Sequence, residues 1–376
     1  MSKRQKLSCL QLEDLPDELL LVIFKFLKMR EILKFGQVST RIRAISNDES
    51  LWMKLNLFEG NVPYVFIEKA VENGCRYLSL VDANLNAVPD MPTLLLRNGK
   101  KIHKTTQIRW NLKYLTCYDF DYYGITVHRG LLKNCHSLQK LSLKNSILSY
   151  EDVEHIIQNS ETLKVLYLSN NFRYGGLNHV SVTKMIQKLF KKCYELSELN
   201  FCNIFSWKDS EILCAIVNNL TPEILKVDLS YDNLKDSHLM ALVKRCSKIT
   251  ELKLGWTSIT NNSVDSIVKH LDSSLEKLDV LKTEIDSTAL LQLGTVRTLK
   301  VLNCLKEEEI DSDTDESNYT PLDTMEMENL RKKLPGISIN KEYVIIATPN
   351  VISNADDGLW EIKAKQEKLF NRYQEN

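Results

Sequence analysis

The sequence contains little glycine and proline, no excess of either charge, and no long apolar run. Only 12 of the 376 residues are glycine and 8 are proline, and no glycine-rich loop of the kind that holds a phosphate is present. The 49 basic and 49 acidic side chains cancel, which argues against nucleic acid as the main partner because phosphate binding requires an electropositive surface. No apolar stretch reaches the roughly 20 residues of a membrane span, so no membrane association is expected.

Catalytic and metal-binding patterns are missing as well. The 7 histidines are scattered along the chain, and neither an H-E-x-x-H motif nor a Cys/His pair at a familiar spacing occurs. We therefore predict that the protein is not an enzyme and has no catalytic residues, no metal site and no cofactor. Binding is the function that this composition leaves.

The 9 cysteines do not form a pattern of disulfide partners or metal ligands. No C-x-x-C pair occurs, and Cys135, Cys193 and Cys246 each stand shortly before a leucine or isoleucine, where a small apolar side chain packs. Free cysteines are typical of a reducing compartment. Because the N-terminal residues also lack the apolar stretch of a signal peptide, we expect the protein in the nucleus and cytoplasm.

The first motif extends from Leu12 to Trp52. Pro16 is suited to the start of a helix, and the two acidic residues after it suit the positive end of the helix dipole. Apolar residues then follow in two stripes at four-residue spacing: Leu15, Leu19, Ile23 and Leu27; Leu20 and Phe24. A segment of about forty residues cannot cover so apolar a helix alone, so the pattern predicts a partner; the alternative is a helix buried in a larger domain.

This segment resembles an F-box at each of its landmarks. It contains LPDELLLVIF at 15–24, the stretch Val38–Arg43, and the closing Asp48–Trp52, with Ile42 where many members of the family have tryptophan. The F-box is a three-helix module that binds a Skp-type adaptor, which connects to a cullin, so the resemblance implies both as partners. By position, the residues that would contact the adaptor are Leu15, Pro16, Leu19, Leu20 and Ile23.

Most of the remaining chain repeats the pattern L-x-x-L-x-L, with other apolar residues allowed at the leucine places. Copies begin at Cys75, Leu112, Leu138, Leu163, Leu196, Ile224, Ile249, Leu275, Leu299 and Leu334. Most spacings are those of leucine-rich repeats, and helical stretches such as 153–157 and 239–243 lie between the copies. A strand-plus-helix unit can bury its apolar face only against its neighbours, so we predict a curved solenoid with a parallel sheet on its concave side.

The predicted fold is therefore of the α/β class: an F-box followed by a leucine-rich-repeat solenoid and a C-terminal tail. Two irregular stretches interrupt it, 86–104 and 306–317, and the seven acidic residues of the second are expected to stay in solvent. The predicted boundaries are 1–11 for a short disordered arm, 12–56 for the F-box, 57–340 for the solenoid with the acidic loop 306–317, and 341–376 for the tail.

Alternation along each strand predicts which side chains reach the concave surface. The two later apolar residues of each motif point into the core, and their neighbours point outward. One further row lies two residues beyond each motif, where Tyr231, Trp256 and Lys282 would stand about 5 Å apart on adjacent strands. Two aromatic rings beside a cation are typical of an interface anchor, so we predict a site for a substrate or accessory protein here. The alternative is that Trp256 packs under the C-terminal tail and only supports it.

Within the F-box/leucine-rich-repeat family the chain is most similar to the S-phase kinase-associated type. The likeness rests on the F-box spelling, the number and spacing of the repeats, and the tail ISINKEYVIIATPN followed by LWEIK at 359–363. It implies that the tail folds back along the concave face with Trp360 near the site, that a Cks-type accessory protein binds there, and that a phosphorylated cyclin-dependent-kinase inhibitor is recruited for ubiquitination. Asn203 stands where an aromatic residue is expected, so a ligase receptor for an unrelated substrate remains a second hypothesis. A leucine-rich-repeat scaffold without ligase function is the third.

Overall fold

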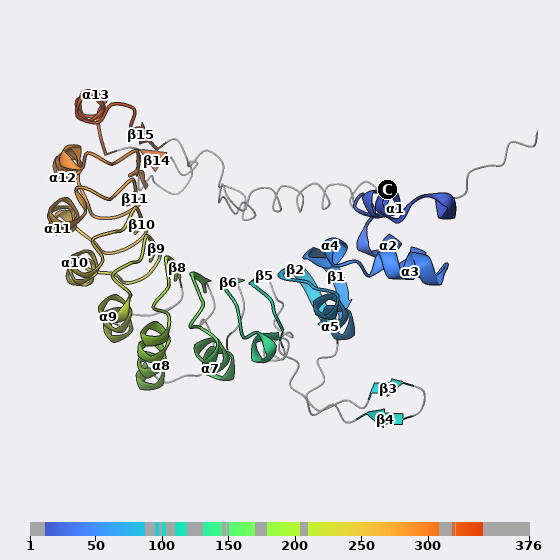
Figure 1. The fold of residues 1–376 in the computed structure, drawn as a ribbon. Helices are drawn as coiled ribbons and strands as arrows, with labels where there is room; N and C mark the ends of the chain where they lie inside the picture. The colour runs from blue at the N-terminus through green and yellow to red at the C-terminus, as the bar shows by residue number, and fades with distance from the viewer. Residues whose placement is uncertain are drawn as a thin grey trace, which may run out of the picture.

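The structure is a computed structural model. The part of the chain that it describes begins with a group of short helices (Figure 1). The described residues are 12–86, 95–97, 100–102, 110–118, 131–144, 148, 150–169, 179–203, 210–307, 318–319 and 321–340. The opening elements are the 3-10 turn η1 (Leu12–Asp14) and the helices α1 (Asp17–Phe24), α2 (Met29–Phe35), α3 (Thr40–Ser46) and α4 (Glu49–Trp52). This is the helical module that the first motif predicts.

The ends of these helices follow from local sequence. Pro16 stands at the N-cap of α1, followed by the acidic first turn. Ser39 caps α3 by accepting a hydrogen bond from the backbone N–H of Ile42 at 3.2 Å. Trp52 is fully buried and its indole N–H donates to the carbonyl of Ser46 at 2.7 Å, so the last helix is tied to the third. Ile42 is also buried, so an aliphatic side chain fills this part of the core.

The rest of the described chain is a solenoid built on one parallel sheet. Its 11 strands follow the order β1-β2-β5-β6-β7-β8-β9-β10-β11-β12-β15. Their bounds are β1 Lys54–Pro63, β2 Tyr77–Asn86, β5 Tyr114–Tyr118, β6 Lys140–Lys144, β7 Val165–Tyr167, β8 Glu198–Asn200, β9 Lys226–Asp228, β10 Glu251–Lys253, β11 Lys277–Asp279, β12 Val301–Asn303 and β15 Ser338–Ile339. Each strand pairs with the strand of the next repeat, as the stacking of repeats requires.

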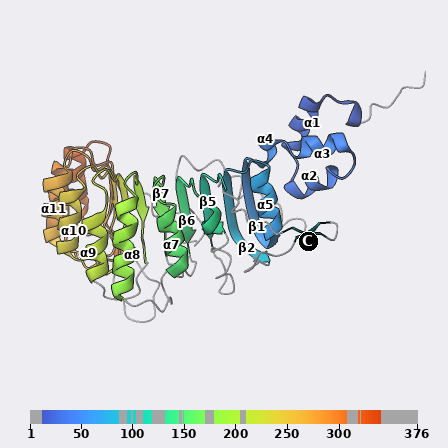
Figure 2. The ribbon, with the colours of Figure 1, turned by 60° about the horizontal axis from the view of Figure 1, so that its bottom comes forward.

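Helices cover the convex side of this sheet, and Figures 1 and 2 show them in a row along the outside of the arc. They are α5 (Tyr64–Glu72), α7 (Tyr150–Gln158), α8 (His179–Lys192), α9 (Ser210–Asn219), α10 (Asp236–Arg245), α11 (Asn261–Leu271), α12 (Ser287–Gln292), the 3-10 turn η2 (Leu293–Thr295) and α13 (Thr324–Lys333). The strands line the inner side, so the concave face is made of strand side chains.

The repeat pattern accounts for the core. The later apolar residues of each motif point inward, as Leu141 and Leu143 do in β6, with no exposed surface. Cys135, Cys193 and Cys246 are buried as predicted, and burial raises the pKa of the Cys193 and Cys246 thiols to about 11. These thiols are therefore packing groups that stay protonated at neutral pH.

The F-box and the solenoid overlap in sequence. Strand β1 begins at Lys54, inside the predicted F-box range 12–56, and pairs with β2 over its whole length. Its motif is Trp52-x-x-Leu55-x-Leu57, with tryptophan at the first apolar place. Phe66 of α5 packs against the Trp52 ring at 5.9 Å between centroids, so one hydrophobic core continues from the helices into the repeats.

Two antiparallel hairpins lie outside the main sheet. Strand β3 (Leu95–Arg97) pairs with β4 (Lys100–Ile102) within the stretch predicted to be a loop. Strand β13 (Lys306–Glu307) pairs with β14 (Asn318–Tyr319) and brackets the acidic stretch. The other residues of both stretches, the arm 1–11 and the tail 341–376 with Trp360 lie outside the described residues.

Candidate functional site: an apolar helix face and an aromatic patch

Helix α1 is held in place by an arginine from α3. The guanidinium of Arg41 donates to the carbonyl of Leu15 at 2.7 Å and, through Nε, to the carboxylate of Asp17 at 2.8 Å. Both partners belong to the first turn of α1 or precede it. Arg43 reaches back to the carbonyl of Gly36 at 3.0 Å and ties α3 to the end of α2. The VSTRIR stretch therefore fixes the orientation of the first helix.

One side of α1 forms the core of the helical module. Leu20 and Phe24 have no exposed surface, and the Phe24 ring lies against that of Phe35 in α2, with 5.9 Å between the centroids. These two residues are four positions apart, so they lie one above the other on the same face of the helix. This stripe anchors α1 to the rest of the module.

The opposite side of α1 exposes a row of large apolar side chains to solvent. Leu19 and Val22 are each 50% exposed, Ile23 is 36% exposed, and Phe26, just beyond the helix, is 86% exposed. Their positions are i, i+3, i+4 and i+7, which is the spacing of one helix face. We refer to these four residues as the α1 stripe. A contiguous apolar row of this kind on a protein surface is typical of an interaction site.

The structure separates the five residues predicted to contact the adaptor. Leu19 and Ile23 lie in the α1 stripe, Pro16 is exposed beside its start, and Leu15 is partly buried against the core. Leu20 is fully buried in the module's own core. The prediction of a direct contact for Leu20 is therefore corrected: its role is to hold α1 in place.

The sequence prediction also missed residues of this surface. Val22 and Phe26 complete the α1 stripe, and Val38, at the turn before α3, is 67% exposed. The spacing of three residues from Leu19 to Val22 and of seven from Leu19 to Phe26 indicates one helix face. This periodicity was hidden because every position from Leu19 to Phe24 is apolar.

The second surface is the aromatic patch at the ends of β9, β10 and β11, formed by Tyr231, Trp256 and Lys282. The Tyr231 and Trp256 rings are stacked, with 5.3 Å between centroids and an angle of 18° between the planes. The ammonium of Lys282 lies 3.9 Å from the centroid of the Trp256 ring. The predicted juxtaposition of the three residues is confirmed. Tyr231 is 51% and Trp256 39% exposed, so both rings present a face or edge to solvent.

The backbone of the patch is in the left-handed region. The φ angles are 63° at Tyr231, 59° at Trp256 and 52° at Lys282, and 51° at Asn203 in the preceding repeat. At this point the chain leaves the sheet, while its N–H groups still pair with the next repeat: Tyr231 N–H donates to the carbonyl of Gly255 at 2.9 Å. A left-handed conformation costs free energy for a bulky residue, so the stacking of repeats maintains the patch geometry.

Charges around the aromatic patch are balanced. Lys226 pairs with Glu198 at 2.7 Å. The Lys253 side chain lies between acidic neighbours; burial alone would lower its pKa, but the carboxylates of Asp228 and Glu251 raise the pKa above its ordinary value. The patch is thus an aromatic surface with one cation, Lys282, which already contacts a ring.

A serine and a histidine lie close together at the start of α10. Ser210 Oγ is 2.9 Å from Nε2 of His238, and the backbone N–H of Lys235 donates to Nδ1 of the same ring at 3.1 Å. Because Nδ1 is an acceptor, the neutral ring carries its hydrogen on Nε2 and donates to the serine. This arrangement is the reverse of a base that activates a nucleophile, and the pair caps the helix instead.

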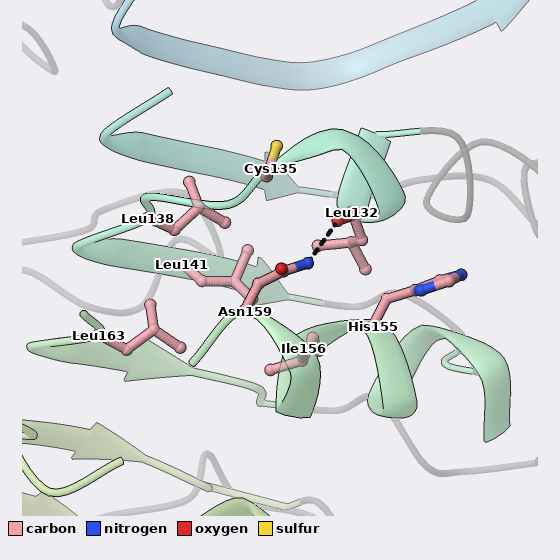
Figure 3. A pocket seen from close by; sticks show the side chains of 8 residues that line it. All are labelled: Leu132, Cys135, Leu138, Leu141, His155, Ile156, Asn159 and Leu163. Atoms are coloured by element: carbon pink, nitrogen blue, oxygen red, sulfur yellow. Dashed lines mark hydrogen bonds between the residues drawn. The ribbon is translucent and has the colours of Figure 1, made fainter. Parts of the chain in front are cut away.

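A narrow gap in the core lies between β6 and α7 (Figure 3). It is lined by Leu132, Cys135, Leu138, Leu141, His155, Ile156, Asn159 and Leu163. Asn159 closes one side by donating to the carbonyl of Leu132 at 3.2 Å. The gap has no room for a water molecule, so it is a packing imperfection between two repeats and not a ligand site.

Metal-binding groups and membrane-spanning helices can be assessed for the described residues alone. Among them, no group of three or more His, Cys, Asp or Glu side chains could hold a metal ion. No helix in the same part of the chain is long and apolar enough to span a bilayer.

One comparison with known proteins concerns the N-terminal helical module, which contains the α1 stripe. Residues 12–57 match the protein family described as F-box-like. A solved structure of an internalin from Listeria monocytogenes is similar over 83% of this chain and 93% of that chain, with 15% sequence identity and a TM-score of 0.41. F-box domains bind Skp-type adaptors, and the α1 stripe lies within the matched residues. The chain therefore combines an F-box-like domain at residues 12–57 with a solenoid of leucine-rich repeats.

Proposed function

We propose that this protein is the substrate-recognition subunit of a Skp–cullin–F-box ubiquitin ligase. The observation that carries the proposal is the α1 stripe, an apolar face within the F-box-like domain that the protein's own core leaves exposed. Burial of such side chains in an interface contributes about 25 cal/mol for each Å² of apolar surface removed from water. The stripe thus provides the driving force for binding a Skp-type adaptor, and through it a cullin.

The solenoid supplies the receptor function in this proposal. Its concave sheet offers a broad surface of strand side chains, and the aromatic patch provides rigid rings of the kind that dominate binding energy in interfaces. The sequence resemblance to the S-phase kinase-associated type extends the proposal. On that ground we propose a Cks-type accessory protein and a phosphorylated cyclin-dependent-kinase inhibitor as partners near the patch, and the nucleus and cytoplasm as the location.

Two alternatives differ in which surface they need. A ligase receptor for an unrelated substrate would use the same α1 stripe with a different occupant of the concave face. A scaffold without ligase function would not need the stripe at all. The exposed Leu19 and Ile23 favour either kind of ligase receptor over the scaffold, because a scaffold without ligase function gains nothing from an exposed apolar row.

The test is affinity purification of the full chain followed by mass spectrometry, with Leu19→Asp and Ile23→Asp as variants. Each change places a charge where the adaptor would exclude water, which costs several kcal/mol. We expect both variants to lose the Skp-type adaptor and the cullin while keeping partners of the solenoid.

The matched control is Val65→Asp on α5. Val65 is 56% exposed, so the same apolar-to-charged change is made at similar exposure on another surface. The control should retain the adaptor. Adaptor recovery by folded Leu19→Asp and Ile23→Asp variants at the level of the control would contradict the proposal.

A further inference from the structure

The concave face divides into two halves of different chemistry. The register of the sheet aligns outward residues into rows, and the first row runs Lys54, Tyr77, Tyr114, Lys140 and Val165 across β1, β2, β5, β6 and β7. The second row over the same strands is Asn56, Ser79, Thr116, Ser142 and Tyr167. Neither row contains an acidic residue from β1 to β7.

The same rows change character from β8 onward. They carry four acidic residues, Glu198, Asp228, Glu251 and Asp279, and three basic residues, Lys226, Lys253 and Lys277. Opposite charges alternate along the first row, and Lys226 pairs with Glu198 at 2.7 Å. This half carries charges of both signs, whereas the charged residues of the same rows in the first half are all cations.

Aromatic and basic side chains contact each other in the N-terminal half. The Tyr77 and Tyr114 rings meet edge to face with 4.8 Å between centroids, and the ammonium of Lys54 lies 5.3 Å from the Tyr77 centroid. We refer to Lys54, Tyr77, Tyr114, Lys140, Lys144 and Tyr167 as the tyrosine–lysine face.

Tyr167 lies at the border of the tyrosine–lysine face, and it contacts both lysine ammonium groups and a carboxylate. The ammonium groups of Lys140 and Lys144 lie 5.7 and 5.5 Å from its ring centroid. Its hydroxyl donates to the carboxylate of Glu198 at 2.7 Å. Burial would raise the pKa of that carboxyl, but hydrogen bonds from Lys226 and Tyr167, with the charges of Lys226 and Lys140, lower the pKa below its ordinary value. A carboxylate on this sheet is thus bound by a tyrosine hydroxyl within a field of lysines.

We propose that the tyrosine–lysine face binds an extended acidic segment of a partner polypeptide. Carboxylates of the segment would accept hydrogen bonds from tyrosine hydroxyls and lysine ammonium groups, as Glu198 does at the border. Rigid tyrosines lose little entropy on binding, and the excess of cations attracts acidic chains over others.

The dimensions fit a short segment. Four intervals between neighbouring strands span about 19 Å at a strand spacing of about 4.8 Å, which an extended chain covers with about six residues. The binding of an acidic segment stands apart from the ligase assignment, while its identification as part of a ubiquitination substrate rests on the proposed function.

The test is fluorescence anisotropy of the full chain with a labelled peptide of alternating Glu and Ser, about ten residues long. The variant is Lys54→Gln/Lys140→Gln/Lys144→Gln, which should bind this peptide at least about tenfold more weakly than the wild type. Tyr114→Ser should also weaken binding. Thermal unfolding of each variant checks that the solenoid is intact.

The control variant is Lys188→Gln/Lys192→Gln/Lys248→Gln, which makes the same change in net charge with lysines outside the concave sheet, in α8 and after α10. It should bind the peptide within about twofold of the wild type, because long-range attraction between exposed charges is screened at physiological salt. Equal weakening by the two triple variants would overturn the proposal in favour of general charge attraction.

Two further arms separate other outcomes. The same peptide with Gln in place of Glu should not bind, and equally tight binding of this peptide would overturn the requirement for acidic groups. A single-stranded oligonucleotide of equal charge should bind more weakly than the peptide, and tighter binding would replace the proposal by a nucleic-acid surface.

The variant Ile23→Asp should bind the peptide normally, so the loss of adaptor binding and the loss of peptide binding are distinguished.

Discussion

Leu19 and Leu20 are neighbours in sequence, yet they have opposite tasks in the structure. The side chain of Leu19 is half exposed, and that of Leu20 is fully buried with Phe24 in the core of the helical module. Successive residues of a helix differ by about 100° in direction, so one turn can hold both a core contact and a docking contact. The proposed docking of an adaptor would depend on both, because the buried residue orients the exposed one.

We predict that Leu20→Ala lowers the free energy of unfolding by about 2–5 kcal/mol, as truncation of a buried leucine does. Leu19→Ala should change it by about 0.5 kcal/mol or less, because little packing is lost. Chemical denaturation of both variants checks the difference. Similar stability losses would show that both leucines are packed in the same way.

The sequence predicted an apolar helix, but not which of its stripes the module's own core buries. Periodicity gives two apolar stripes, Leu15–Leu27 and Leu20–Phe24, of similar character. Only the packing of α2 and α3 against the second stripe decides between them. That choice depends on tertiary contacts from Phe35 and Ile42, which local sequence does not encode.

His238 makes folding sensitive to pH. It accepts a hydrogen bond from Lys235 N–H, and burial, followed by the positive charge of Lys235, lowers its pKa below the ordinary 6.5. The neutral ring is the form that the fold requires. Its contribution is therefore complete above pH 6.5 and is lost as the pH falls through the lowered pKa.

We predict that His238→Gln reduces the loss of stability between pH 7.5 and pH 5.5. Glutamine at this helix position can accept the Lys235 N–H without taking up a proton. Melting temperatures of wild type and variant across this range provide the measurement. An equal acid-induced decrease in both proteins would assign the pH dependence to other groups.

Trp256 tests the aromatic patch. Trp256→Ala removes the ring that contacts both Tyr231 and Lys282, so we expect partner capture by the C-terminal repeats to weaken by about 2 kcal/mol. Tyr194→Ala, which truncates an aromatic residue that is 59% exposed elsewhere, is the matched control. Pull-down of a Cks-type protein and a phosphorylated inhibitor, with the adaptor as internal standard, gives the readout. Capture that is unchanged would leave Trp256 with a structural role only.

At the scale of elements, polar side chains at the helix starts link successive repeats. Asp236 in the first turn of α10 accepts hydrogen bonds from the backbone N–H and the hydroxyl of Thr260, the N-cap of α11, at 2.8 and 2.7 Å. Asn261 in turn donates to Asp286, the N-cap of α12, at 2.8 Å. The starts of α11 and α12 are thus each hydrogen-bonded to the start of the helix before them.

We predict that Asp236→Ala destabilises the C-terminal repeats by about 2 kcal/mol, since it removes several hydrogen bonds to a charged group. Asp265→Ala, at an exposed position of α11, should have little effect. Urea denaturation and hydrogen exchange of α10 and α11 distinguish the two. Equal protection of these helices in both variants would show that the link contributes nothing.

Most strands were predictable at this scale, and the exceptions have physical reasons. The repeat starts from Leu112 to Leu299 lead directly into β5 to β12, because the motif places two inward residues on each strand. Strand β1 was missed because Trp52 stands at the first apolar place of its motif. The left-handed conformation of Tyr231, Trp256 and Lys282 was also beyond sequence reasoning, since that region normally favours glycine or asparagine.

At the scale of the whole molecule, the chain consists of an F-box-like helical module followed by a long concave sheet. The F-box-like module lies at one end of the arc and the aromatic patch near the other, and a continuous core joins them (Figure 1). In the proposed function, such an array would hold a bound partner at a fixed position relative to the adaptor.

Phe26 provides the most direct test of this account, because it is 86% exposed and has no structural reason to be phenylalanine. The measurement is isothermal titration of the purified chain with a purified Skp-type adaptor, comparing wild type, Phe26→Ala and the control Val65→Ala. We predict that the wild type and control bind with equal affinity and that Phe26→Ala binds at least about tenfold more weakly, as expected for an exposed aromatic residue that an interface buries. An adaptor that does not bind the wild type, or that binds all three proteins equally, would contradict the central claim.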